Sequence, residues 1–172
     1  MYDLLMLTFN EKRHRHLHSD KIFVKALNKN GRTKNKYYYE MWPFINNCYG
    51  ILYKLFTKEK FGEFECCDEM FEFKTTNVLD LSLKNYIPNA TDECIDDWVS
   101  IKLNDDYKEE FISILDFLTS CSPTLTIAFL CRGQSIDNEI VVGTLSYDDF
   151  LEKLCSGNIK TNICYLVRKT RE

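Results

Sequence analysis

The sequence predicts an α+β fold with a largely antiparallel sheet and about three helices. Short runs in which apolar and polar residues alternate, as in half-buried strands, recur along the chain, and at three places the apolar spacing changes to the helical three or four residues. No internal repeat or linker-like run interrupts the 172 residues, so we expect one domain over residues 1–172. With 45% apolar residues and only 6 Gly and 3 Pro, the composition excludes disordered and collagen-like chains.

The first third of the chain predicts two strands and a helix. Met1–Phe9 and Lys21–Leu27 are the strands, and the second ends at the turn-prone Asn28–Gly31. Pro43 suits the first turn of a helix, and Gly62 can end that helix. The apolar residues between them follow helical spacing: Phe44, Ile45, Cys48, Tyr49, Leu52, Leu55 and Phe56.

The middle of the chain predicts further strands and a second helix. Phe71 and Phe73 alternate with charges, which indicates a half-buried strand; Val78–Leu83 is another candidate, and Trp98–Leu103 also alternates. Asn104 can cap the helix that follows. The apolar face of that helix is made of Tyr107, Phe111, Ile114, Leu115 and Leu118.

The last third carries the clearest local signals. Thr124–Cys131 and Glu139–Leu145 are predicted to form a hairpin. Ser146–Asp149 resembles a capping box at the start of a short helix, and Gly157 can end that helix in the left-handed conformation. Ile159–Val167 is apolar on both faces, so we expect this closing strand in the centre of a sheet.

The order of charges at the start predicts a soluble cytoplasmic protein. Met1–Phe9 is apolar, but the basic residues follow it instead of preceding it, the reverse of a secretory signal. The most apolar stretch, Thr124–Cys131, is far shorter than the ~20 residues of a spanning helix, so no membrane segment is expected. The eight cysteines include no Cys-x-x-Cys pair, which predicts reduced thiols without a zinc ribbon or disulfide framework.

Charge is distributed unevenly along the chain. Residues 1–60 hold 12 basic and 5 acidic residues, whereas residues 61–172 hold 10 and 21, for a total of −4. An acidic surface with an aromatic residue can steer and anchor a basic protein partner. Asp105 and Asp106 also suit the positive end of a helix dipole, and an ordinary solvated surface is the alternative interpretation. The candidate binding residues are Asp92, Glu93, Asp96, Asp97, Trp98, Asp105 and Asp106.

Two other functions stay open from the residues alone. His14, His16 and His18 would share one face of a strand and could bind a metal or do acid–base chemistry, although Arg13 and Arg15 oppose a cation and an exposed basic loop is the simpler interpretation. The basic segment from Lys12 to Lys36, followed by Tyr37–Tyr39, could bind nucleic acid, although the chain as a whole is acidic.

No motif in the sequence specifies catalysis. There is no Gly-rich phosphate loop and no Gly-x-Ser-x-Gly elbow, and nothing indicates a cofactor or a resident metal. We therefore expect a protein that is not an enzyme and that acts by binding another protein, without direct contact with nucleic acid.

The C-terminal segment resembles a known family. A strand over 138–145, a helix with the pattern Leu145-Ser146-x-x-x-Phe150-Leu151, Gly157 and a strand with Asn162-x-x-Tyr165 are similar to the C-terminal part of small bacterial immunity proteins. These proteins neutralise polymorphic toxins, including ribonuclease toxins of contact-dependent growth inhibition. The resemblance implies a cytoplasmic, non-enzymatic inhibitor that binds one cognate toxin domain and blocks its active site. It transfers no individual binding residue.

Overall fold

A computed structural model describes residues 2–14, 19–28, 44–45, 48–57, 65–75, 99–133 and 140–171. This part of the chain contains nine strands, two α-helices and one 3-10 helix. In chain order they are β1 (Tyr2–Thr8), β2 (Phe23–Ala26), β3 (Ile51–Phe56), η1 (Asp68–Met70), β4 (Phe71–Thr75), β5 (Val99–Leu103), α4 (Asp105–Cys121), β6 (Thr126–Gly133), β7 (Ile140–Ser146), α5 (Tyr147–Ser156), β8 (Ile159–Lys160) and β9 (Ile163–Arg168).

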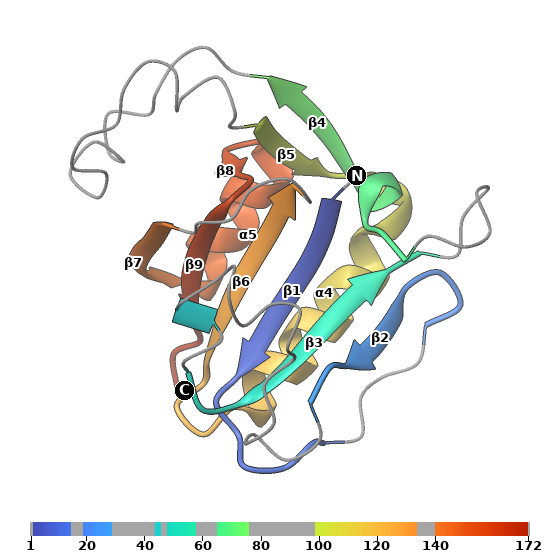
Figure 1. The fold of residues 1–172 in the computed structure, drawn as a ribbon. Helices are drawn as coiled ribbons and strands as arrows, with labels where there is room; N and C mark the ends of the chain where they lie inside the picture. The colour runs from blue at the N-terminus through green and yellow to red at the C-terminus, as the bar shows by residue number, and fades with distance from the viewer. Residues whose placement is uncertain are drawn as a thin grey trace.

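The strands form a mostly antiparallel α+β architecture, as predicted. Six of them make one sheet in the order β2-β3-β1-β6-β9-β7, with β1 near its middle (Figure 1). Every neighbouring pair in this sheet is antiparallel except β7 and β9. A second antiparallel sheet has the order β4-β5-β8.

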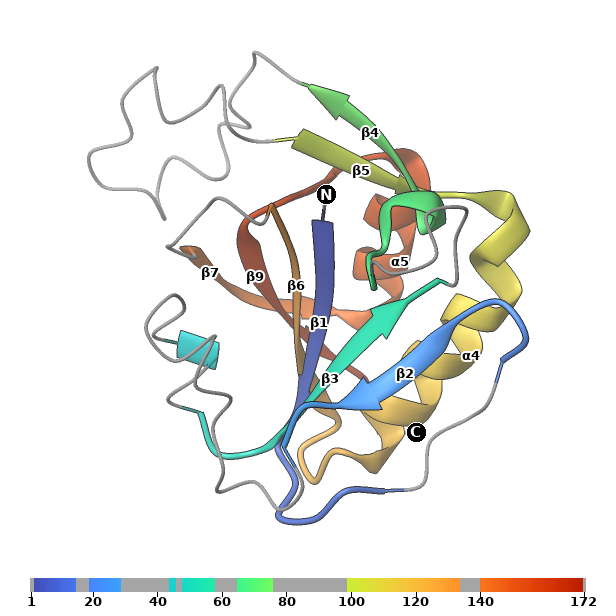
Figure 2. The same cartoon turned by 45° about the vertical axis from the view of Figure 1, so that its right-hand side comes forward.

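The large sheet carries buried apolar side chains on both of its faces. Helices α4 and α5 lie on the same face, with α4 against β1 and β6 and α5 against β7 and β9 (Figures 1 and 2). On that face the rings of Phe129 and Phe150 meet edge to face, with their centroids 4.8 Å apart. Leu5, Leu52 and Leu130 point to the opposite face and are also buried. Side chains of β1 therefore alternate between two cores.

The prediction that the helix after Pro43 includes Ile51–Phe56 is wrong. Phe44 and Ile45 are helical, but Ile51–Phe56 forms β3, which lies between β2 and β1. A strand that is buried on both faces loses its alternation of apolar and polar residues, and its apolar run can then imitate helical spacing. The structure consequently describes two α-helices where about three were expected.

The prediction that β6 and β7 form a hairpin is also wrong. β9 pairs with β6 on one side and with β7 on the other, and β7 runs parallel to β9 through the crossover helix α5. The prediction that the closing strand is central is confirmed. However, Thr161 and Asn162 divide it, so that β8 joins the small sheet and β9 the large one; Asn162 has a left-handed φ of 64°.

The signals for α5 and for the buried face of α4 are confirmed, whereas the side chain of Asn104 does not cap α4 as predicted. The Ser146 side chain accepts a hydrogen bond from the Asp149 backbone N–H, and Gly157 ends α5 with a φ of 81°. Phe111, Ile114, Leu115 and Leu118 form the buried face of α4, as their spacing predicted. The predicted strands at residues 1–9, 21–27, 71–73 and 98–103 correspond to β1, β2, β4 and β5, whereas Val78–Leu83 lies outside the described residues.

Candidate functional site

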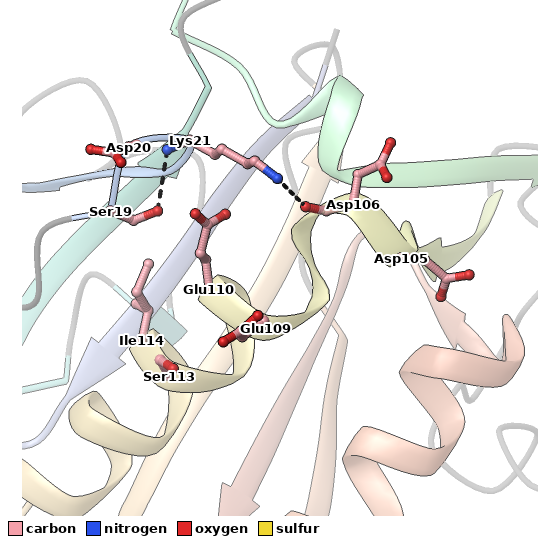
Figure 3. Close-up of a pocket in the computed structure, with 9 residues that line it drawn as sticks. All are labelled: Ser19, Asp20, Lys21, Asp105, Asp106, Glu109, Glu110, Ser113 and Ile114. Carbon is pink, nitrogen blue, oxygen red and sulfur yellow. Dashed lines mark hydrogen bonds between the residues drawn. The ribbon is translucent and has the colours of Figure 1, made fainter.

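An acidic groove lies along the first turns of α4. Its opposite wall is the segment Ser19–Lys21, which leads into β2, and the groove has a volume of about 660 Å³ (Figure 3). Five carboxyl groups and one ammonium group line it, for a formal charge of −4. The acidic residues are Asp20, Asp105, Asp106, Glu109 and Glu110, and Lys21 is the basic one.

The start of α4 holds these carboxylates in place. Asn104 is the capping residue by position, but its side-chain amide donates to the backbone oxygen of Glu69 (2.7 Å) and does not cap the helix. This contact and the pairing of β5 with β4 fix the point at which α4 begins. Asp105 and Asp106 then occupy the first turn, where negative charge is stabilised by the free N–H groups of the helix.

Lys21 joins the two walls of the groove. Its ammonium Nζ donates to the backbone oxygen of Asp106 (2.9 Å) and lies 6.0 Å from the centre of the Tyr107 ring. The backbone N–H of Lys21 donates to the Ser19 hydroxyl (3.2 Å), which fixes the turn on the far wall. The Lys21 ammonium therefore connects the two walls, and among the described residues it makes no ion pair with the carboxylates of the groove.

Glu110 is the most enclosed acid of the groove. Its side chain rises from α4 towards the Ser19–Lys21 wall (Figure 3). The Oε2 atom is shielded from solvent and has no hydrogen-bond partner among the described residues. A shielded carboxylate oxygen without a partner is energetically unfavourable, so a cation that enters the groove would be stabilised there.

The structure places only part of the predicted acidic surface. Asp105 and Asp106 both line the groove, although Asp105 points away from the other carboxylates (Figure 3). Asp92, Glu93, Asp96, Asp97 and Trp98 lie outside the described residues. Sequence reasoning did not select Glu109 and Glu110, although their positions three and four residues after Asp106 put all three on one side of the helix. The residues around Asp20 in the sequence do not indicate a binding site, because only the folded chain brings Asp20 next to α4.

The alternative sites are described only in fragments. His14 is exposed, and His16 and His18 lie outside the described residues. Where the structure describes the chain, no group of three or more His, Cys, Asp or Glu residues could hold a metal ion. Of the basic segment, Lys12, Arg13, Lys21 and Lys25 are exposed, whereas Lys29–Lys36 and Tyr37–Tyr39 are not described.

The described cysteines are all free thiols. The sulfur atoms of Cys67 and Cys131 lie 3.9 Å apart, and both side chains are fully buried. Burial raises the pKa of the Cys67 thiol well above its usual value, with Cys131 adding to the effect. Since the thiolate is the reactive form, this environment keeps Cys67 unreactive at neutral pH.

Comparison with known proteins does not assign a family. No protein-family model and no solved structure matches the sequence. A stretch of 76 residues is 33% identical to the chloroplastic acetyl-coenzyme A carboxylase carboxyl transferase subunit beta of Nandina domestica. The match covers 44% of this chain but only 15% of the plant protein. Neither described helix is both long and apolar enough to cross a membrane.

Proposed function

We propose that this chain is an immunity protein that binds a cognate toxin domain, a ribonuclease, and covers its basic active site in the cytoplasm. The observation that carries the proposal is the acidic groove along α4, a space of about 660 Å³ that is lined by five acidic residues and one lysine. A ribonuclease needs a basic cleft to hold phosphates, and an acidic protein surface is complementary to such a cleft.

Two further observations support this function. The segment from β7 to β9 carries the pattern that resembles immunity proteins, and in the fold it forms a parallel β-α-β unit. The unpartnered Oε2 of Glu110 offers a position for a lysine or arginine side chain of the toxin. In this proposal the chain inhibits by occupying the toxin's active site and needs neither a cofactor nor catalysis of its own.

The partial plant match does not lead to a second proposal. It covers only 15% of a carboxyl transferase subunit, too small a share to carry the activity of that protein over to this chain. Among the described residues, no cluster favours an enzyme that uses His14, His16 and His18 or a nucleic-acid-binding module that uses the basic N-terminal segment.

The test first asks whether a large secreted protein with a toxic C-terminal domain is encoded beside this gene, and then uses that domain. Co-expression of the chain should restore growth of cells that produce this domain, and the purified chain should block its cleavage of RNA. Normal RNA cleavage at saturating concentrations of the chain, or the absence of any such neighbouring gene, contradicts the proposal.

Charge-reversal variants locate the surface. Glu109→Lys with Glu110→Lys should slow association about tenfold or more at low salt, and the difference should shrink at high salt. Asp96→Lys with Asp97→Lys tests the undescribed half of the predicted surface in the same way. Glu152→Lys, on an exposed part of α5, is the matched control and should leave association nearly unchanged.

A further inference from the structure

A second groove, with the opposite charge, lies at the other end of α4. It has a volume of about 580 Å³ and is formed by the last turn of α4, the start of α5 and the residues that end and follow β9. Arg168, Lys169 and Arg171 line it, with Asp148 as the one acidic residue. The two grooves therefore give the ends of one helix opposite electrostatic character.

Lys169 has a structural role in this groove. Its ammonium forms an ion pair with Asp116, donates to the Ser120 hydroxyl (3.3 Å) and lies 5.3 Å from the centre of the Tyr147 ring. Its backbone N–H donates to the oxygen of Leu125 (2.8 Å), a residue with a left-handed φ of 53°. These contacts fix the chain between Arg168 and Arg171.

The side chains of the two arginines in the groove have no such structural role. Arg168 and Arg171 are exposed, and neither guanidinium group makes a hydrogen bond or ion pair with a described residue, whereas the Arg168 backbone pairs with β6 and β7. Because Asp116 neutralises Lys169, the charge available in the groove is two guanidinium groups against the carboxylate of Asp148. The start of α5 adds little, since Ser146 already accepts from the Asp149 N–H and the first turn carries two acids.

We infer that this groove binds a phosphate monoester through Arg168 and Arg171. A guanidinium group donates two parallel hydrogen bonds and is satisfied by the two oxygens of one carboxylate. Two guanidinium groups on either side of a fixed residue need a ligand with more acceptor oxygens, which the three terminal oxygens of a phosphate monoester supply. The three basic positions span only four residues, which suits a small ligand better than a polynucleotide.

The test titrates the full chain with inorganic phosphate, with a ribonucleoside 5′-monophosphate and with a short RNA that lacks terminal phosphates. Backbone amide NMR shifts at residues 147–148 and 168–171 report on the groove. The first two probes should cause saturable shifts there. Arg168→Gln or Arg171→Gln should each weaken binding about tenfold, as expected for the loss of hydrogen bonds to a charged group.

Two further variants distinguish this site from general charge attraction. Asp148→Asn removes the opposing carboxylate and should tighten phosphate binding, whereas Lys153→Gln removes an exposed positive charge at the far end of α5 and should change nothing. The mutated residues are exposed, so circular dichroism should show an unchanged fold. No saturable shift, equal affinities for all variants, or binding of the RNA alone overturns the inference. None of these results depends on the toxin, so the proposed immunity function is tested separately.

Discussion

The carboxylates of the acidic groove should reduce the stability of the fold they belong to. In α4, Asp105 and Glu109 are four residues apart, Asp106 and Glu110 are four apart, and Asp106 and Glu109 are three apart. Like charges at these spacings destabilise a helix by about 0.2–0.5 kcal/mol per pair. Glu109→Gln combined with Glu110→Gln removes all three pairs and should raise the free energy of unfolding by about 1 kcal/mol.

This gain can be measured by urea and thermal unfolding monitored by circular dichroism. For a chain of this length, 1 kcal/mol corresponds to a rise of about 2–4 °C in Tm. The gain should be largest at low ionic strength and should shrink in ~1 M salt, where the screening length falls to about 3 Å. Glu11→Gln changes an exposed carboxylate outside the groove and serves as the control.

Two results would refute the reasoning. A double variant that is less stable than the parent protein at low salt would mean that Glu109 or Glu110 is held by favourable contacts. A gain that persists unchanged in high salt would mean that it does not arise from repulsion between exposed charges. If the gain is found together with slower toxin association, the groove exchanges stability for partner recognition.

Three further predictions concern the fold and the basic groove. Ser146→Ala removes the side-chain cap of α5 and should lower the free energy of unfolding by about 1 kcal/mol in urea titrations, whereas a change within error would show that the cap is dispensable. Gly50→Ala would place a methyl group 2.3 Å from the backbone oxygen of Thr8, so it should lower the free energy of unfolding by about 3 kcal/mol or abolish soluble expression. Gly133→Ala should be tolerated, because the nearest atom to its methyl group would be 3.7 Å away. Equal melting temperatures of the two variants would contradict this contrast. Burial, helped by Asp116 and Asp148, raises the pKa of Tyr147 to about 12, so ultraviolet titration should show a late phenolate that is missing from Tyr147→Phe. The stability due to neutral Tyr147 should be complete below about pH 10 and lost as the pH rises through 12, and Tyr147→Phe should remove this component.

Sequence reasoning succeeded where a structure is decided by residues that are close in the chain. The cap at Ser146, the left-handed Gly157 and the apolar face of α4 are encoded within one or two helical turns. It failed where the partner is distant. The residues of β3 are apolar on both faces because sheet neighbours and cores surround them, and nothing in Ile51–Phe56 alone distinguishes that burial from a helix.

The same distinction applies to the candidate site. Asp105 and Asp106 could be predicted because acids at a helix start are a local feature. The opposite wall could not, since Lys21 and Asp106 are 85 residues apart in the chain and meet only after β2 has joined the sheet. The basic groove was missed for the same reason, because its residues come from the end of α4, the start of α5 and the segment after β9.

The central place of β1 in the large sheet has a consequence for synthesis of the protein. One partner of this strand, β6, lies far along the chain, with Asp3 and Arg132 separated by 129 residues. At about 5–20 residues per second, the ribosome needs on the order of 10 s to make the intervening polypeptide. During that time one edge of an apolar strand has no partner within the nascent chain. Chaperones have this interval in which to bind it, and a fragment that stops before Thr126 should not reach the native state.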